Sequence, residues 1–239
     1  MRPGRRRLAG DVTMTPAPTG TAPLTSVKVD IWSDIACPWC FIGKRTFEEA
    51  VRRLPELDVE IEYHSFELSP DTPEDFEGDE VAFLAQHKGM PEDQVRQMLA
   101  TVTGRAADVG LAYDFDRLQH TNTVTAHRLL HLAKQHGVQR EMKERLLRAY
   151  FEEGRHVGRV ADLADLAVEV GLDRDEVVAT LESDAFLEAV RADQAQAQAF
   201  GITGVPFFVL DGRYGVSGAQ APETFVQVLE RVRDEAGTA

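Results

Sequence analysis

Cys37 and Cys40 are the two cysteines of the chain, and they enclose a proline and a tryptophan in a Cys-Pro-Trp-Cys turn. Two thiols at this spacing can close on each other and exchange disulfides with other thiols. If Cys37 caps a helix, Pro38 takes the first helical position, where its missing N–H costs nothing. The helix dipole and the free amides of the first turn then favour a thiolate at Cys37. We therefore predict that Cys37 attacks a partner disulfide and that Cys40 resolves the mixed disulfide.

Other uses of the two cysteines conflict with their surroundings. A structural disulfide within one turn would constrain little of the unfolded chain. A zinc site would need two more ligands, and His127 and His131 stand four residues apart on one predicted helix. The periodicity of that helix places both histidines toward solvent beside Lys134, so we predict no metal site. An interpretation of the two cysteines as inert buried residues is disfavoured by Pro38 at the start of a helix. Trp39 offers an apolar face on which a partner chain can pack.

A second unusual string, Gly-Ile-Thr-Gly-Val-Pro-Phe-Phe, covers residues 201–208. A proline at the head of a strand cannot donate to the ladder, and X-Pro bonds are the ones that adopt the cis form. A cis Val205–Pro206 bond beside the cysteine turn would leave the backbone of Val205 free to pair with an extended partner segment. An ordinary trans proline at the end of a loop is the alternative.

Strand patterns stand at the two ends of the chain and helical patterns stand between them. Val27–Trp32 and Leu57–Phe66 read as strands around a helix that starts at Pro38, which is a β-α-β opening. Helical periodicity then dominates to about residue 200, and the Asp211-Gly212 turn afterwards predicts a hairpin. We predict an α/β domain formed by 27–75 and 200–236, an inserted helical domain over 76–199 and a flexible tail over 1–26.

Composition narrows the possible partners. The chain has 239 residues, 43% of them hydrophobic, and a formal net charge of −14, which repels nucleic acid and anionic lipid surfaces. No run of 18 apolar residues exists, so a transmembrane helix is not expected. Although Arg5, Arg6 and Arg7 lie near the start, no apolar signal core follows them, and Met14 is an alternative first residue. We expect a cytoplasmic protein.

Together the two motifs resemble the thioredoxin superfamily, and the helical block between the halves looks like its DsbA branch. The strings at residues 34–43, 66–70 and 122–129 are similar to the FrnE-like subgroup, whose members are predicted dithiol-disulfide isomerases often encoded beside polyketide pathways. The resemblance implies a thioredoxin-like fold, Cys37 as attacking thiol, Cys40 as resolving thiol, Pro206 as a cis-proline and Val205 as a backbone contact. The chain departs from DsbA proper, which has a histidine in the turn, and from relatives with further cysteines.

The resemblance also raises the question of a buried acid that takes the proton of the resolving cysteine, for which Glu62 and Glu67 are candidates. It implies no metal or bound cofactor, with glutathione as a candidate co-substrate, and protein or low-molecular-weight thiols and disulfides as partners of a monomer or homodimer. One rival is a kappa-class glutathione transferase or 2-hydroxychromene-2-carboxylate isomerase, which would not need Cys40. The other is a redox-inactive holdase that binds unfolded chains through Trp39, Phe207 and Phe208.

Overall fold

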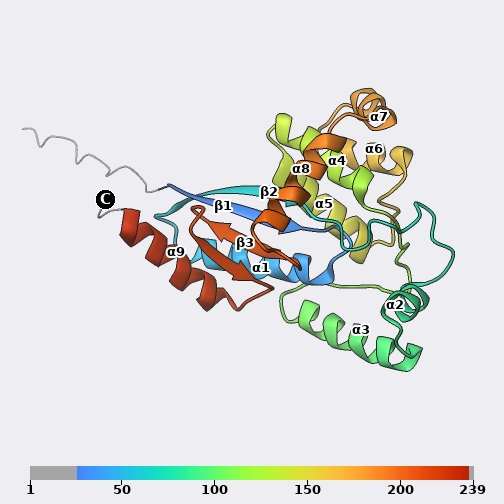
Figure 1. Cartoon of the computed structure of the whole chain (residues 1–239), viewed down its shortest axis with the longest axis horizontal. Helices are drawn as coiled ribbons and strands as arrows, with labels where there is room; N and C mark the ends of the chain where they lie inside the picture. Colours follow the sequence, from blue (N-terminus) through green and yellow to red (C-terminus); the bar gives the residue numbers. More distant parts are fainter. Residues whose placement is uncertain (1–25, 237–239) are drawn as a thin grey trace, which may run out of the picture.

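The computed structural model describes residues 26–236, and in them the predicted strands form one four-stranded sheet with helices on both sides (Figure 1). The strands are β1 (Ser26–Ser33), β2 (Asp58–Ser65), β3 (Phe207–Leu210) and β4 (Tyr214–Ser217). The helices are α1 (Pro38–Arg52), α2 (Glu80–Lys88), α3 (Glu92–Ala107), α4 (Val124–Gln135), α5 (Gln139–Phe151), α6 (Val160–Val168), α7 (Arg174–Glu182), α8 (Leu187–Ala199) and α9 (Pro222–Ala236). The mixed α/β architecture predicted from the sequence is confirmed.

The sheet has the order β2-β1-β3-β4, so the two ends of the chain meet at its centre. β1 pairs in parallel with β2 and antiparallel with β3, and β3 pairs antiparallel with β4. The hairpin predicted at Asp211-Gly212 is confirmed, because this turn joins β3 to β4 and both residues have positive φ angles of 52° and 64°.

Alternation along β1 sends successive side chains to opposite faces of the sheet. Ile31 faces α1 and α9, where it joins a buried cluster with Phe47 and Phe225. Trp32 faces the other way, into a smaller cluster with Ala197 of α8. The sheet is therefore covered on both faces. This explains why β1 carries apolar side chains on both faces near its end, Ile31 on one and Trp32 on the other.

Helices α2 to α8 lie between β2 and β3 in the chain and form two groups in Figure 1. The larger group contains α4 to α7, and its core also takes in Ile35 and Phe41 from the segment around the cysteine turn. The smaller group is α2 and α3, which share a core of Val81, Val95 and Leu99. The domain bounds at 75/76 and 199/200 stay a prediction.

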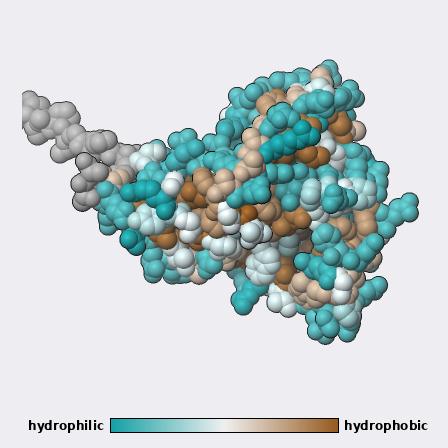
Figure 2. Space-filling view, in the orientation of Figure 1, coloured by the Kyte–Doolittle hydropathy of each residue, from teal (hydrophilic) through white to brown (hydrophobic). Residues whose placement is uncertain are grey.

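Figure 2 shows hydrophilic side chains over much of the visible surface, with apolar patches between them. None of the helices within residues 26–236 is long and apolar enough to cross a bilayer. The tail predicted over 1–26 lies outside the described residues except for Ser26, the first residue of β1.

Candidate active site

The cysteine turn has the local geometry that its sequence predicts. Cys37 is the N-cap of α1 with extended backbone angles, and Pro38 occupies the first turn. The amide of Cys40 donates to the carbonyl oxygen of Cys37 over 3.0 Å, which closes that turn. Helix α1 therefore places both side chains at its amino end.

Tertiary packing brings the second motif to this turn. The Val205–Pro206 peptide bond is cis, and the thiol of Cys37 donates to the carbonyl oxygen of Val205 over 3.4 Å. Gly43 of α1 lies against the Pro206 ring so closely that a Cβ atom there would lie 2.9 Å from Cγ. Residues that stand 168 positions apart in the chain thus share one site.

The two thiols are free, buried and electrostatically unequal. Burial opposes ionisation of Cys40, but a hydrogen bond from Cys37 and the positive charge of Lys143 bring the pKa of Cys40 below its usual value. The hydrogen bond that Cys37 gives to Cys40, together with burial, raises the pKa of Cys37 well above its usual value. Lys143 thus favours a negative charge on the pair of thiols, and the attack by a Cys37 thiolate stays a prediction.

Lys143 is a functional candidate that the sequence interpretation missed. It lies on α5 with 1% of its surface exposed, and its Nζ is 3.5 Å from the carbonyl oxygen of Ser33. Burial lowers the pKa of Lys143 to about 8, although Cys40 and Asp34 attract its proton. A signal was present, since Lys143 stands on the stripe of α5 that Met142, Leu146 and Leu147 define as buried.

Asp34 and His127 form a second buried pair beside the cysteines. Burial opposes ionisation of Asp34, but His127 and the amide of Leu68 hold its pKa below the usual value. The Nε2 atom of His127 is 3.3 Å from Oδ1 of Asp34, and the Leu68 amide donates to Oδ2 over 2.8 Å. The site thus contains a buried carboxylate that is already satisfied by neighbours.

The expectation that His127 and His131 face solvent is wrong, because α4 is enclosed on more than its apolar stripe. His127 is fully buried, and the side chain of His131 is 12% exposed. They contact different carboxylates, since Nε2 of His131 lies 3.1 Å from Asp193. Within residues 26–236, the group of potential metal ligands that meets within reach of one ion is Asp30, Glu62 and His64, which includes neither cysteine.

Glu62 and Glu67, the predicted proton acceptors, have other partners. Glu62 forms ion pairs with Lys134 and Lys28 on the β2 side of the sheet. Glu67 accepts a hydrogen bond from Gln194 over 2.7 Å. These contacts give no support for a role of either carboxylate at Cys40, where Lys143 is the strong nearby charge.

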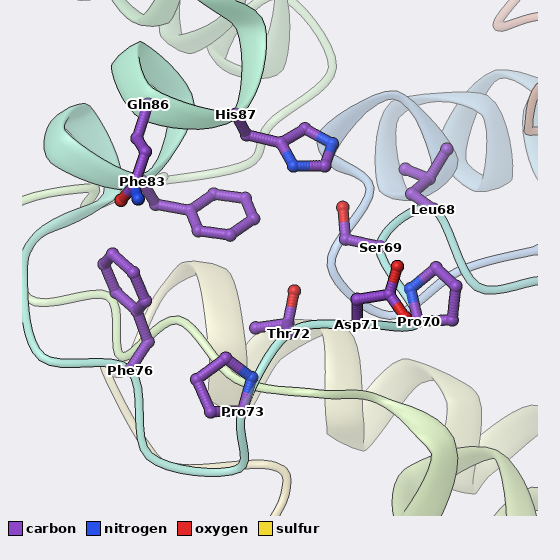
Figure 3. A pocket seen from close by; sticks show the side chains of 10 residues that line it. All are labelled: Leu68, Ser69, Pro70, Asp71, Thr72, Pro73, Phe76, Phe83, Gln86 and His87. Carbon is purple, nitrogen blue, oxygen red and sulfur yellow. The ribbon is translucent and has the colours of Figure 1, made fainter.

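A cavity of about 330 Å³ opens beside Cys37, between the cysteine turn, the loop before the cis-proline and the helices α2 and α3. Its wall includes the predicted substrate-binding residues Pro38, Trp39 and Val205, and Trp39 is 40% exposed. A second hollow of about 600 Å³ shares Leu68, Ser69, Phe83 and His87 with it. Figure 3 shows Phe83 and His87 pointing from α2 toward the loop that carries Leu68 and Ser69.

With this geometry in place, comparisons with known proteins identify the family. Residues 28–230 match the DSBA-like thioredoxin domain. The uncharacterized protein YwbO of Bacillus subtilis is 30% identical over 210 residues, which is 85% of this chain and 96% of that protein. A probable DsbA oxidoreductase from Streptomyces coelicolor is 43% identical, with a TM-score of 0.81 over 86% of this chain and 89% of that one.

A more distant neighbour shares the fold alone. The cytosolic disulfide reductase DsbM from Pseudomonas aeruginosa, solved with GSH, is 18% identical with a TM-score of 0.60, over 85% of this chain and 98% of that one. The predicted thioredoxin-like fold with inserted helices is confirmed by these matches. The chain belongs to the family of DSBA-like thioredoxin domains.

Proposed function

We propose that this protein is a thiol-disulfide oxidoreductase that exchanges electrons through Cys37 and Cys40. The single observation that carries the proposal is the meeting of three parts at one cavity: the capping thiol of Cys37, the resolving thiol below it and the Val205 carbonyl. A partner disulfide bound in the cavity lies next to Cys37, whereas Cys40 is screened from it by the turn.

The reaction balances in two exchange steps. Cys37 loses its proton, and its thiolate attacks R–S–S–R′ to form Cys37–S–S–R and release R′S⁻. Cys40 then loses its proton and attacks the sulfur of Cys37, which forms the Cys37–Cys40 disulfide and releases RS⁻. The substrate gains two electrons, and the same steps run in reverse oxidise a dithiol.

The charges around the two cysteines fit this order of exchange steps. Lys143 stabilises a thiolate at Cys40, the stage from which Cys40 must attack. Cys37 donates its thiol proton to the Val205 carbonyl oxygen in this structure, and Cys40 lies close enough to accept that proton instead. No metal or bound cofactor enters these steps, and we propose that the protein acts in the cytoplasm, as its neighbour DsbM is described as doing.

Trapping of the mixed disulfide tests the proposal. We expect Cys40→Ser, incubated with an aromatic disulfide, to retain one half of the reagent on Cys37, as mass spectrometry of the intact protein would show. The wild type should release both halves and lose two protons, and Cys37→Ser should remain unmodified. An adduct on Cys37→Ser as fast as on Cys40→Ser would contradict the assigned order of the thiols.

The same variants separate the rival functions. A glutathione transferase of the kappa class or a 2-hydroxychromene-2-carboxylate isomerase should keep its activity in Cys40→Ser, because its chemistry needs no resolving thiol. A holdase should bind unfolded client with equal affinity after Cys37→Ala. Isomerase activity, which the FrnE-like resemblance implies, predicts that scrambled protein disulfides are rearranged by the wild type and not by Cys37→Ser.

A further inference from the structure

Ser33 is a buried serine whose hydroxyl the exchange steps do not use. It is the last residue of β1, and 2% of its surface is exposed. Because side chains alternate along a strand, Ser33 lies on the same face of the sheet as Ile31, which packs with residues of α1. The Oγ atom has no hydrogen-bond partner within the described residues. Buried hydroxyls almost always have a partner, so this one needs an explanation.

The neighbours of this hydroxyl identify the atom that can accept its proton. Nζ of Lys143 lies 3.5 Å from the carbonyl oxygen of Ser33, and an ammonium group can only donate. Cys40 lies in the first turn of α1. Burial opposes ionisation of Cys40, and the Ser33 side chain and the Asp34 amide are among the groups around its sulfur that lower its pKa. A thiol is a weak acceptor and a thiolate a strong one, so ionisation of Cys40 supplies the partner that the hydroxyl lacks.

We propose that Ser33 is a catalytic residue of the exchange reaction, whose hydroxyl donates a hydrogen bond to the thiolate of Cys40. This proposal rests on the proposed function and adds a donor to its second step. In that step the thiolate of Cys40 attacks the sulfur of Cys37, the new S–S bond forms, the bond to R breaks and RS⁻ leaves with the electron pair. Ser33 keeps its proton throughout, so it stabilises the attacking anion and leaves the proton balance unchanged.

A hydrogen bond to a thiolate changes its reactivity in two opposite ways. The bond lowers the pKa, so more of the thiol is ionised at a given pH, but it also weakens the nucleophile. With a Brønsted coefficient of about 0.5, a pKa rise of about 1 unit leaves about a tenth of the thiolate, which is about three times as reactive. Loss of the hydroxyl should therefore slow the second step below the pKa of Cys40 and speed it above that pKa. A general loss of structure would not produce this crossover.

The first test is a titration of Cys40 alone. In Cys37→Ser, thiolate absorbance against pH gives the pKa of Cys40, and the variant that also carries Cys40→Ser serves as the blank. We expect Ser33→Ala in this background to raise the pKa of Cys40 by about 1 to 2 units, because a hydrogen bond to a charged group is lost. Ser33→Thr keeps a hydroxyl and should change the pKa by less than about 0.5 unit.

Ser65→Ala is the matched control. Ser65 is the partner of Ser33 in the register of β1 and β2, it is 3% exposed, and its hydroxyl lies 3.2 Å from Nε2 of His131. Its replacement should leave the pKa of Cys40 within about 0.5 unit of the unchanged background. The other ionisable groups around the two cysteines stay the same in all of these variants, so the comparison isolates the hydroxyl; they are Asp34, Tyr63, Tyr113 and Lys143.

The second test separates the two exchange steps with an excess of an aromatic disulfide whose released halves absorb light. Stopped-flow absorbance resolves release of the first half, by attack of Cys37, from release of the second half, by attack of Cys40. Below the pKa of Cys40, Ser33→Ala should slow the second phase about three- to tenfold, and above that pKa it should speed this phase. In Cys40→Ser, where only the first step occurs, Ser33→Ala should change the rate by less than about twofold. Ser65→Ala should match the wild type in both phases.

An unchanged pKa of Cys40 in Ser33→Ala, equal slowing of both phases, or slowing of the second phase at every pH overturns the proposal. If Ser33→Ala does not fold, Ser33→Gly removes the same hydroxyl and decides the test. A wild type that releases neither half of the reagent defeats the proposed function. A wild type that releases both halves, with no effect of Ser33→Ala on the second phase, defeats the role of Ser33 alone.

Discussion

Replacement of Lys143 by methionine tests the buried cation at the active site. Lys143 is 1% exposed and forms no ion pair with a carboxylate of residues 26–236, so keeping its buried side chain protonated costs free energy. Its pKa falls from 10.5 to about 8. Because one pKa unit corresponds to about 1.4 kcal/mol, the charge costs about 3 kcal/mol below pH 8.

The sign of the pH dependence follows from the direction of the shift. The folded pKa of Lys143 lies below its unfolded value, so the unfolded chain binds more protons between pH 8 and 10.5. The stability of the wild type should therefore rise through this window relative to Lys143→Met. At pH 7 we expect the variant to be more stable by about 2 to 3 kcal/mol, since methionine fills the site without a charge. The difference in unfolding free energy between the variant and the wild type should vanish near pH 10.5.

Urea unfolding of the reduced proteins at pH 6.5, 8 and 9.5 gives these free energies. Lys134→Met is the control, because its side chain is 47% exposed and its removal should change stability by less than about 0.5 kcal/mol at every pH. Loss of Lys143 should also raise the pKa of the Cys40 thiol, which thiolate absorbance would report. A variant that is less stable at pH 7, or a gap that stays constant with pH, would refute the reasoning.

Two further predictions concern the framework around the site. His64 is bridged by Asp30 and Asp193, each at 2.9 Å, and after the cost of burial these carboxylates raise its pKa to about 9. The stabilisation from protonated His64 is complete below about pH 6.5 and is lost as pH rises through 9. At pH 6, urea unfolding should therefore show His64→Gln to be less stable than the wild type by up to about 3 kcal/mol. A difference in unfolding free energy that does not narrow by pH 9 would contradict this prediction. Gly43→Ala should destabilise the protein by about 1 to 3 kcal/mol and slow oxidation of the dithiol, because the new Cβ would lie 2.9 Å from Pro206. Its control, Gly104→Ala on α3, has nothing within 4 Å of the Cβ and should gain up to about 1 kcal/mol; equal thermal shifts for the two variants would count against the argument.

Local features of the active site could be predicted from the sequence because neighbouring residues produce them. The Cys37 cap, the proline of the first turn and the Asp211-Gly212 hairpin depend on backbone preferences over a few residues. The strands at both chain ends follow from alternation, which fixes the two faces of a strand. The Cys-Pro-Trp-Cys turn and the Gly-Val-Pro-Phe-Phe string, taken together, were enough to predict the thioredoxin-like fold.

The surroundings of the thiols depended on contacts between distant parts of the chain. Helical periodicity shows that Lys143 faces inward, but the partner that it meets there, Cys40, lies 103 positions earlier in the chain. The same limit explains the error at His127, since a stripe pattern assigns one buried face and α4 is enclosed on more than one. It also explains why Glu62 and Glu67 were considered in place of Lys143.

The sequence by itself therefore determined which thiols can react and the helix end that holds them, because those properties are local. The tertiary structure decided which cation lies beside the thiols, which carbonyl faces Cys37 and which residues line the cavity. These depend on burial and on distances between charges, and both quantities exist only after the helices between the two halves of the sheet have packed.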